Sequence, residues 1–183
     1  KGIIYIWTNK NLKSRKLEIK IRNDLGIEQR LLTREEVLEL EPNLNPVFDA
    51  GVIYDYAYHA RDPKEITKKL FDLFLKLGGK FKKDEVLSIE QTRFNQTQVK
   101  TSSEMFKFEK LVLACGAFSK KFTDQLGEKI PLDTERGYHV HYQKMDHLLT
   151  RPVIFLDRGF GMTPMNQGLR AVGTVELGGF DNP

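Results

Sequence analysis

The sequence predicts a mixed α/β fold of the α+β kind, on three observations. Segments with a helical spacing of apolar residues alternate with short runs of β-branched and aromatic residues. The stretch LVLACGAFSKK, residues 111–121, passes from an apolar run through Cys115-Gly116 into a segment compatible with a helix. Residues after Leu132 favour strands almost throughout.

The first part of the chain is predicted to hold two strands and two helices. Residues 2–8 are rich in β-formers, and residues 9–25 carry apolar side chains at helical spacing. The short helix TREEVLELEP is expected because Thr33 stands three residues before Glu36, which is the spacing of a capping box. Residues 51–58 then favour a strand.

The clearest helix follows Asp62-Pro63, a pair that supplies an N-cap carboxylate and a proline at the first helical position. Gly78-Gly79 is expected to end this helix. Its apolar residues recur at helical spacing: Ile66, Leu70, Leu73, Phe74 and Leu77.

Short β-like runs follow this helix, and three of them resemble a meander. The runs are residues 85–90, 97–101, 105–109 and 110–114. A helix after Gly116 is expected to end near Gly127. The last predicted strands are residues 132–142, 152–157, 159–164 and 169–177.

Composition excludes several classes of protein. The 29 Lys and Arg residues nearly balance the 25 Asp and Glu residues, so the net charge of +4 and pI of about 9.0 give little support for nucleic-acid binding. The one cysteine, Cys115, allows no intramolecular disulfide and reads as a small buried residue. No apolar run has the length of a membrane span, and no signal peptide is visible, so we expect a cytoplasmic location.

The sequence has no phosphate-binding loop of its own. Gly159-Phe160-Gly161 begins like a dinucleotide fingerprint, but Pro164 replaces the third glycine, and a turn between strands is the preferred interpretation. Residues 173–179 lack the Lys-Ser/Thr pair of a Walker motif. Ser119 lacks the second glycine of a nucleophile elbow, which disfavours an α/β-hydrolase.

Five side chains are candidates for binding or catalysis. His139 and His141 share one face of a strand but lack a third ligand, so a polar pocket wall or a solvated face is preferred to a metal site. Packing is favoured over a nucleophilic role for Cys115. Arg136 and Arg170 are the stronger candidates, because a guanidinium can bind a carboxylate through two parallel hydrogen bonds. An ordinary salt bridge, at the surface or between lobes, has at least equal weight for each of them.

An ordered series of segments resembles the FAD-dependent D-amino-acid oxidase and dehydrogenase family, which includes enzymes like glycine oxidase and sarcosine oxidase. The segments are LEPNL, RDPKEITKKLFDLFLKLGGKF, EVLSI, KLVLACGAFSKKF, IPLDTERGYHV and LRAVGTVELGG. They span nearly the whole chain, and their order and spacing carry the resemblance together.

The resemblance implies FAD as the cofactor and assigns two segments to it. A backbone group at Val86 is expected near the adenine, and the stretch Ala114, Cys115 and Gly116 near the pyrophosphate and ribitol. Small residues in such a stretch allow the backbone to approach a bulky ligand. The family's GxGxxG segment and its closing segment are not found here, so the chain is expected to be the middle of the enzyme and not to retain FAD alone.

On the same resemblance, residues 59–130 are expected to be the central part of the FAD-binding domain. Residues 1–58 and 131–183 would form a mixed-sheet substrate lobe. The substrate-pocket candidates are Arg136, Tyr138, His139 and Arg170. Strand alternation puts Arg136 and Tyr138 on the face opposite to His139, and Tyr138 is preferred.

The activity implied is oxidation of the amine carbon of a D-amino acid or N-substituted glycine, with hydride transfer to flavin. A flavin-dependent 2-hydroxy-acid oxidase, similar to one acting on L-2-hydroxyglutarate, and a non-catalytic binding module are the alternatives. No catalytic side chain is assigned, because the flavin carries the chemistry. The partner is a small molecule, and the chain alone is expected to be inactive and to associate through exposed apolar surface.

Overall fold

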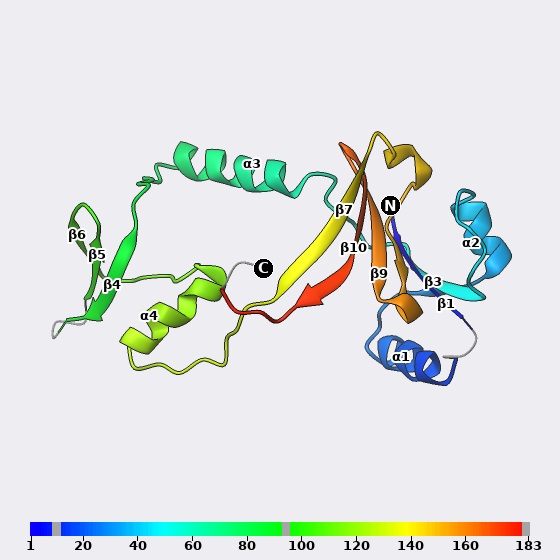
Figure 1. Cartoon of the computed structure of the whole chain (residues 1–183), viewed down its shortest axis with the longest axis horizontal. Helices are drawn as coiled ribbons and strands as arrows, with labels where there is room; N and C mark the ends of the chain where they lie inside the picture. Colours follow the sequence, from blue (N-terminus) through cyan, green and yellow to red (C-terminus); the bar gives the residue numbers. More distant parts are fainter. Residues whose placement is uncertain (9–11, 93–95, 181–183) are drawn as a thin grey trace. The chain divides into compact units, whose positions relative to one another are not determined.

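The computed structural model describes residues 1–8, 12–92 and 96–180, which form two compact units (Figure 1). Unit 1 consists of Lys1–Phe71 and Gly137–Glu176, and unit 2 of Asp72–Arg136 with the residues from Leu177 on. Both units combine strands with helices, which confirms the predicted mixed α/β class.

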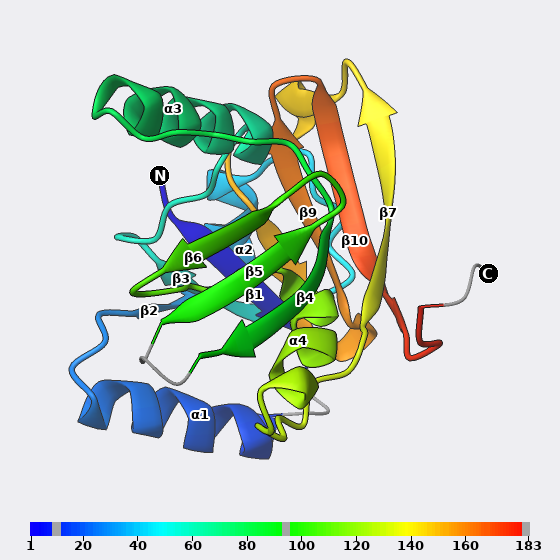
Figure 2. The same cartoon turned by 90° about the vertical axis from the view of Figure 1, so that its left-hand side faces the viewer.

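A sheet of seven strands dominates the described part of unit 1, in the order β2-β3-β1-β8-β9-β10-β7. The strands are β1 (Ile3–Trp7), β2 (Arg30–Thr33), β3 (Ala50–Tyr54), β7 (Arg136–Gln143), β8 (Val153–Phe155), β9 (Phe160–Met165) and β10 (Gly168–Glu176). β1 pairs with β8 in parallel and with β3 antiparallel, so the sheet is mixed. Figure 2 shows β9, β10 and β7 side by side at one end of this order.

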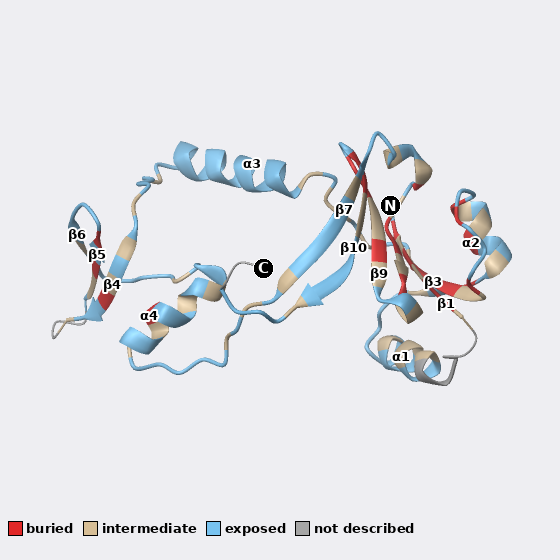
Figure 3. Cartoon of the chain, viewed as in Figure 1, coloured by how far each residue is buried: buried red, intermediate tan, exposed pale blue. Residues whose placement is uncertain are grey.

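The core of unit 1 lies where the first strands meet the short helix α2 (Arg34–Leu40). The buried members of this core are Ile4, Ile6, Leu32, Val37, Leu44, Phe48, Ile53, Leu149, Val153, Phe155 and Leu169. A Cβ on Gly51 would lie 3.0 Å from both the Tyr5 carbonyl oxygen and a Val37 methyl carbon, so glycine allows α2 to pack closely on the sheet. Figure 3 shows the buried residues concentrated on β1, β3 and neighbouring elements.

The capping box predicted for α2 is confirmed. The Glu36 N–H donates to Thr33 Oγ1 at 3.2 Å, and the Thr33 N–H donates to Glu36 Oε2 at 2.8 Å. These two bonds satisfy backbone donors that the first helical turn leaves without partners.

The helix α1 (Leu12–Asp24) lies where a helix was predicted, and residues 9–11 of that prediction fall outside the described residues. Its apolar side chains Leu17 and Ile21 are exposed. Arg15 and Arg22 are the more buried side of the helix, and the Arg22 guanidinium lies 5.6 Å from the Tyr54 ring centroid. This helix therefore contacts β3 of the same unit through the Arg22 guanidinium.

The helix α3 (Pro63–Lys76) confirms the clearest sequence prediction. The Glu65 N–H donates to Asp62 Oδ1 at 3.1 Å, which is the expected N-cap, and Gly78 has a positive φ of 87° just beyond the helix. None of its residues is buried, and Leu77 just beyond it is 80% exposed. Figure 3 shows the whole helix in the exposed colour. Its apolar face thus has no cover in the described structure, and association through it stays a prediction.

Unit 2 contains the predicted meander. The strands β4 (Val86–Gln91), β5 (Thr97–Thr101) and β6 (Met105–Phe108) pair in that order. The helix α4 (Ser119–Gln125) follows a short 3-10 turn at Gly116–Phe118. Its Phe122 packs with Ile89 and Val99, and these three buried residues form the unit 2 core.

The prediction of a buried strand at residues 110–114 is wrong. These residues have no regular secondary structure, and Val112 is 86% exposed. A strand exists only where its backbone N–H and C=O groups meet a neighbouring strand, and no described strand pairs with this run. Cys115 is likewise exposed, so the expectation of a buried cysteine is also wrong.

Among the described residues, no helix combines the length and the apolar character that crossing a bilayer requires.

Glu41, at the C-terminal end of α2, is a buried charge with a complete set of partners. Its side chain is 1% exposed and accepts from the Arg151 Nε–H at 2.9 Å. The Thr150 N–H and hydroxyl also donate to it, at 2.9 and 2.5 Å. These bonds attach α2 to the segment before β8, two regions far apart in the sequence.

We predict that Glu41→Ala lowers the free energy of unfolding by about 3 kcal/mol, because it leaves Arg151 and Thr150 without their acceptor. Glu39→Ala, at an exposed position on the same helix, should change it by less than about 0.5 kcal/mol. Urea unfolding midpoints measure both variants. Equal midpoints for the two would contradict the role of Glu41.

Candidate functional site

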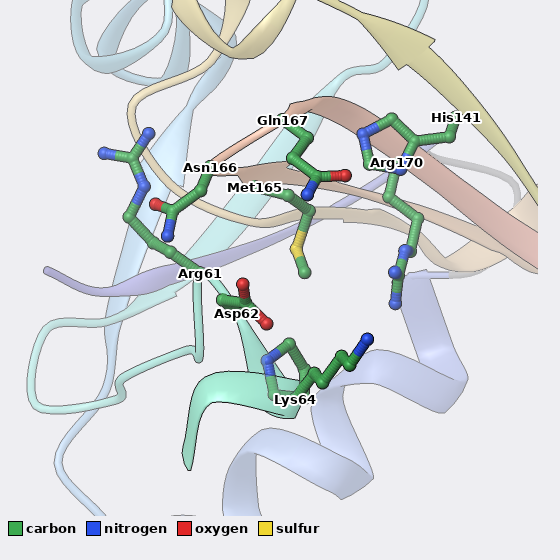
Figure 4. Close-up of a pocket in the computed structure, with 9 residues that line it drawn as sticks. Arg61, Asp62, Lys64, His141, Met165, Asn166, Gln167 and Arg170 are labelled. Atoms are coloured by element: carbon green, nitrogen blue, oxygen red, sulfur yellow. The ribbon is translucent and has the colours of Figure 1, made fainter. Parts of the chain in front are cut away.

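A pocket of about 420 Å³ opens in unit 1 between the start of α3 and the β9–β10 hairpin (Figure 4). It is lined by Arg61, Asp62, Pro63, Lys64, His141, Met165, Asn166, Gln167 and Arg170. All of these residues belong to unit 1, so the pocket is formed within one compact unit.

The hairpin wall of the pocket is held by backbone contacts on two sides. The Asn166 N–H donates to the Arg61 carbonyl at 3.1 Å, which ties the turn to the residues before α3. The Lys144 N–H donates to the Gln167 carbonyl at 3.2 Å. Gly168 has a φ of 145°, and a Cβ there would lie 2.1 Å from the Tyr142 carbonyl oxygen, so this close approach requires glycine.

Arg170 extends into the pocket from β10. It stands opposite Thr163 in the antiparallel pairing of β9 and β10. Its Nε atom is buried and has no hydrogen-bond partner in the described chain, and the same holds for Nε2 of His141 on β7. Buried polar atoms are usually satisfied, so two such atoms at one pocket indicate a place for a polar ligand.

The charges around the pocket are unequal. Arg61, Lys64 and Arg170 are cationic, and Asp62 is the only carboxylate among the lining residues. Asp62 is engaged as the N-cap of α3, and Arg61 lies 3.3 Å from the Asp146 carboxylate. Lys64 and Arg170 therefore remain without a carboxylate partner among the described residues.

This arrangement is suited to binding a small anion. A guanidinium presents several N–H donors in one plane and can bind a carboxylate through two of them. Buried Met165 supplies an apolar surface beside these donors. Figure 4 shows Arg170 and Lys64 reaching the pocket from different elements.

The pocket includes one of the four residues predicted for substrate binding. Arg170 lines it, whereas Tyr138 and His139 do not. The Tyr138 hydroxyl donates instead to the Glu176 carboxylate, and His139 is exposed. Arg136 begins β7 and belongs to unit 2. Substrate contacts by Arg136, Tyr138 and His139 stay predictions.

The sequence interpretation missed Arg61 and Lys64 as pocket residues. For His141, a place in a polar pocket wall was one of the two interpretations preferred to a metal site, and the structure puts it in the pocket wall. Arg61 and Lys64 flank the Asp62-Pro63 helix start, and this position was the available signal, because the first turn of a helix favours anions.

The residues assigned to FAD all lie in unit 2. Val86 and Leu113, the neighbour of Ala114, both pack against the unit 2 core, which brings the two predicted cofactor segments onto one cluster. Ala114, Cys115 and Gly116 are exposed, and a Cβ on Gly116 would meet no atom within 4 Å. Exposed backbone with short side chains fits a bulky cofactor, so these residues are compatible with FAD.

His59 lies just before the pocket residues and is partly buried. Burial lowers the pKa of its imidazole, and a hydrogen bond with the Pro164 backbone opposes that shift. Its Nε2 atom is buried without a partner in the described structure. The neutral form is therefore favoured in the folded protein.

The comparisons with known proteins agree with this fold. All 183 residues match the family model described as DAO, FAD dependent oxidoreductase. A D-amino-acid oxidase of Bradyrhizobium diazoefficiens is 28% identical over 180 residues, which are 98% of this chain and 43% of that protein.

Two solved structures extend the comparison. Glycine oxidase from Bacillus cereus ATCC 14579 has a TM-score of 0.79 at 28% identity, covering 99% of this chain and 50% of its own. Glycine oxidase from Geobacillus kaustophilus has a TM-score of 0.86 at 20% identity, covering 99% of this chain and 49% of its own. The chain thus spans about half the length of these relatives.

The fold and the family match define the class as that of flavin-dependent oxidoreductases. Within that class, the chain belongs to the DAO family of FAD-dependent oxidoreductases.

We predict that stability falls with acid below about pH 6.5 partly because of His59. A histidine whose pKa is lowered on folding binds fewer protons in the folded state, so protonation of the unfolded state withdraws stability as the pH falls. Melting temperatures between pH 5 and about 8 test this. The variant His59→Gln should flatten the profile, whereas His147→Gln at an exposed position should not. Identical profiles for His59→Gln and the parent would contradict the prediction.

Proposed function

We propose that the whole protein is a FAD-dependent oxidoreductase that oxidises the amine-bearing carbon of an amino acid. The observation that carries this proposal is the family match over every residue of the chain. Similarity to a D-amino-acid oxidase and to a glycine oxidase, both at 28% identity, supports amino acids as the substrate class.

Unit 1 is proposed to bind the substrate, and unit 2 to supply part of the FAD-binding domain. The unpartnered cations of the pocket support the first assignment. The assignment of unit 2 to FAD is supported by Val86 and Leu113, the neighbour of Ala114, because both pack against the unit 2 core. Val86, Ala114, Cys115 and Gly116 are the residues proposed to contact the cofactor, mainly through their backbone.

Arg170 is the residue proposed to hold the substrate carboxylate. In this proposal the unpartnered Nε–H donates to one carboxylate oxygen, and a second guanidinium N–H donates to the other. Buried Met165 excludes water from the same wall. Fixing the carboxylate orients the neighbouring amine carbon, and such positioning lowers the barrier of the chemical step.

The reaction converts the amine to an imine as the amine carbon gives up a hydride and the nitrogen gives up a proton to solvent. Water then hydrolyses the imine to a 2-oxo acid and ammonia, or to a 2-oxo acid and a primary amine where the nitrogen is substituted. Bound FAD supplies the acceptor for the hydride that leaves the amine carbon. No side chain of this chain is required as a general base in this scheme. The contribution of the described residues is to bind, orient and desolvate the substrate.

We expect the full-length protein to show flavin absorption bands near roughly 370 and 450 nm and to be bleached by an amino acid without oxygen. The spectrum should be recorded before and after addition of D-amino acids and N-methylglycine. A bound flavin that only 2-hydroxy acids bleach would move the substrate to the alternative class. A protein that takes up no FAD would contradict the proposal as a whole.

We predict that Arg170→Met raises KM for the amino acid at least about tenfold, because the charge-assisted bonds to the carboxylate are lost. Arg170→Lys should recover part of this loss, since a point charge replaces the planar group. Steady-state kinetics of the FAD-loaded full-length protein measure the effect. The control is Arg30→Met, an exposed residue 3.7 Å from Asp55, which should leave KM unchanged. An unchanged KM in Arg170→Met would remove the carboxylate role.

A further inference from the structure

The pocket contains more positive charge than one substrate carboxylate needs. A carboxylate bound by the Arg170 guanidinium would satisfy that residue alone. Lys64 would still face the pocket with no ion-pair partner among the described residues. Two cations at one pocket repel each other, so a ligand with one negative charge would leave part of this repulsion in place.

The remaining charges of the pocket do not neutralise Lys64. Asp62 points one carboxylate oxygen at the Glu65 N–H, 3.1 Å away, and thereby caps α3. Arg61 and Asp146 form an ion pair at 3.3 Å, so the charge of Asp146 is neutralised by Arg61 and not by Lys64. His141 adds a buried ring nitrogen without a partner, which is a further position for a polar group.

The two cations come from different elements of the fold. Arg170 comes from β10 and Lys64 from the first turn of α3, and these elements are joined by the 3.1 Å bond between the Asn166 N–H and the Arg61 carbonyl. Pro63 and buried Met165 line the same pocket and provide apolar surface. A ligand with two carboxylates joined by a short chain of methylene groups could present one carboxylate to each cation and its methylene groups to the apolar surface.

We propose that the pocket selects an amino acid with a second anionic group in its side chain, with Arg170 holding one carboxylate and Lys64 the other. Lys64 is then the residue that determines specificity for acidic over neutral side chains. This inference rests on the proposed amino-acid oxidoreductase function and deepens it by naming the substrate class.

Kinetic specificity tests the proposal directly. D-glutamate and D-glutamine have nearly the same shape and differ by one charge, so the ratio of their kcat/KM values isolates the effect of that charge. The full-length, FAD-loaded protein should prefer D-glutamate by about tenfold at low ionic strength. Because Lys64 is exposed, the preference should decrease as salt is added. Equal kcat/KM values for the two substrates would overturn the proposal.

A pair of variants separates the pocket charge from the general surface charge. Lys64→Met should bring the ratio of the two kcat/KM values close to one by lowering kcat/KM for D-glutamate much more than kcat/KM for D-glutamine. Lys68→Met removes the same charge one turn farther along α3, outside the pocket, and should keep the preference. An equal loss in both variants would show that the effect belongs to the surface of the helix and would overturn the role of Lys64.

A binding measurement makes the inference independent of turnover. Glutarate, butyrate and inorganic phosphate can be compared by the rise in melting temperature that each produces in the full-length protein. Glutarate should stabilise the parent protein more than butyrate or phosphate, and Lys64→Met should abolish the difference. Equal stabilisation by butyrate, or stronger stabilisation by phosphate, would overturn the dicarboxylate assignment.

The two proposals fail in different ways. If no amino acid reduces the flavin, the proposed function fails, and the glutarate comparison still decides whether the pocket binds two carboxylates. If neutral amino acids bleach the flavin as well as acidic ones, the function stands and the inference about Lys64 is overturned.

Discussion

The hydrogen bond from the Asn166 N–H to the Arg61 carbonyl is the contact on which the candidate pocket depends. It joins the tight turn between β9 and β10 to the residues that lead into α3. Through it, a guanidinium on β10 and an ammonium group on α3 face one pocket, although they are far apart in the chain. The glycine at position 168 permits this turn because the Tyr142 carbonyl leaves no space for a Cβ.

In the same pocket, both nearby carboxylates are already engaged, which leaves two cations without a carboxylate partner among the described residues. Asp62 is engaged by the start of α3, and Asp146 pairs with Arg61, so neither balances Lys64 or Arg170. Elsewhere in unit 1 a buried charge is fully matched, since Glu41 accepts from both Arg151 and Thr150. The contrast distinguishes a structural ion pair, which is complete within the chain, from cations that have no carboxylate partner among the described residues.

Unit 2 is organised around a much smaller core. Three buried residues of β4, β5 and α4 hold it together, and the Gln125 side chain accepts from the Ile89 N–H at 2.9 Å. Apolar residues of α3 and of residues 110–114 remain exposed in the described structure. The small core nevertheless brings the segment of Val86 next to that of Ala114, and this is the arrangement that a shared cofactor contact requires.

The sequence by itself determined the elements whose signals are local. The capping box of α2, the Asp62 cap of α3 and the three-stranded meander were predicted correctly, because hydrogen bonds between near neighbours and apolar periodicity produce them. The ordered segments also indicated the family, which the match over the full chain confirms. Arg170 was identified as a candidate from its residue type and position in an apolar strand.

Only the tertiary structure decided which side chains meet. The strand predicted at residues 110–114 failed because strand formation depends on a partner that local sequence does not reveal. Lys64 and His141 joined Arg170 because strand order and the anchored β9–β10 turn placed three separate segments around one pocket. This placement results from the burial of apolar surface across the whole sheet. That burial involves residues far apart in the sequence, so no short motif predicts it.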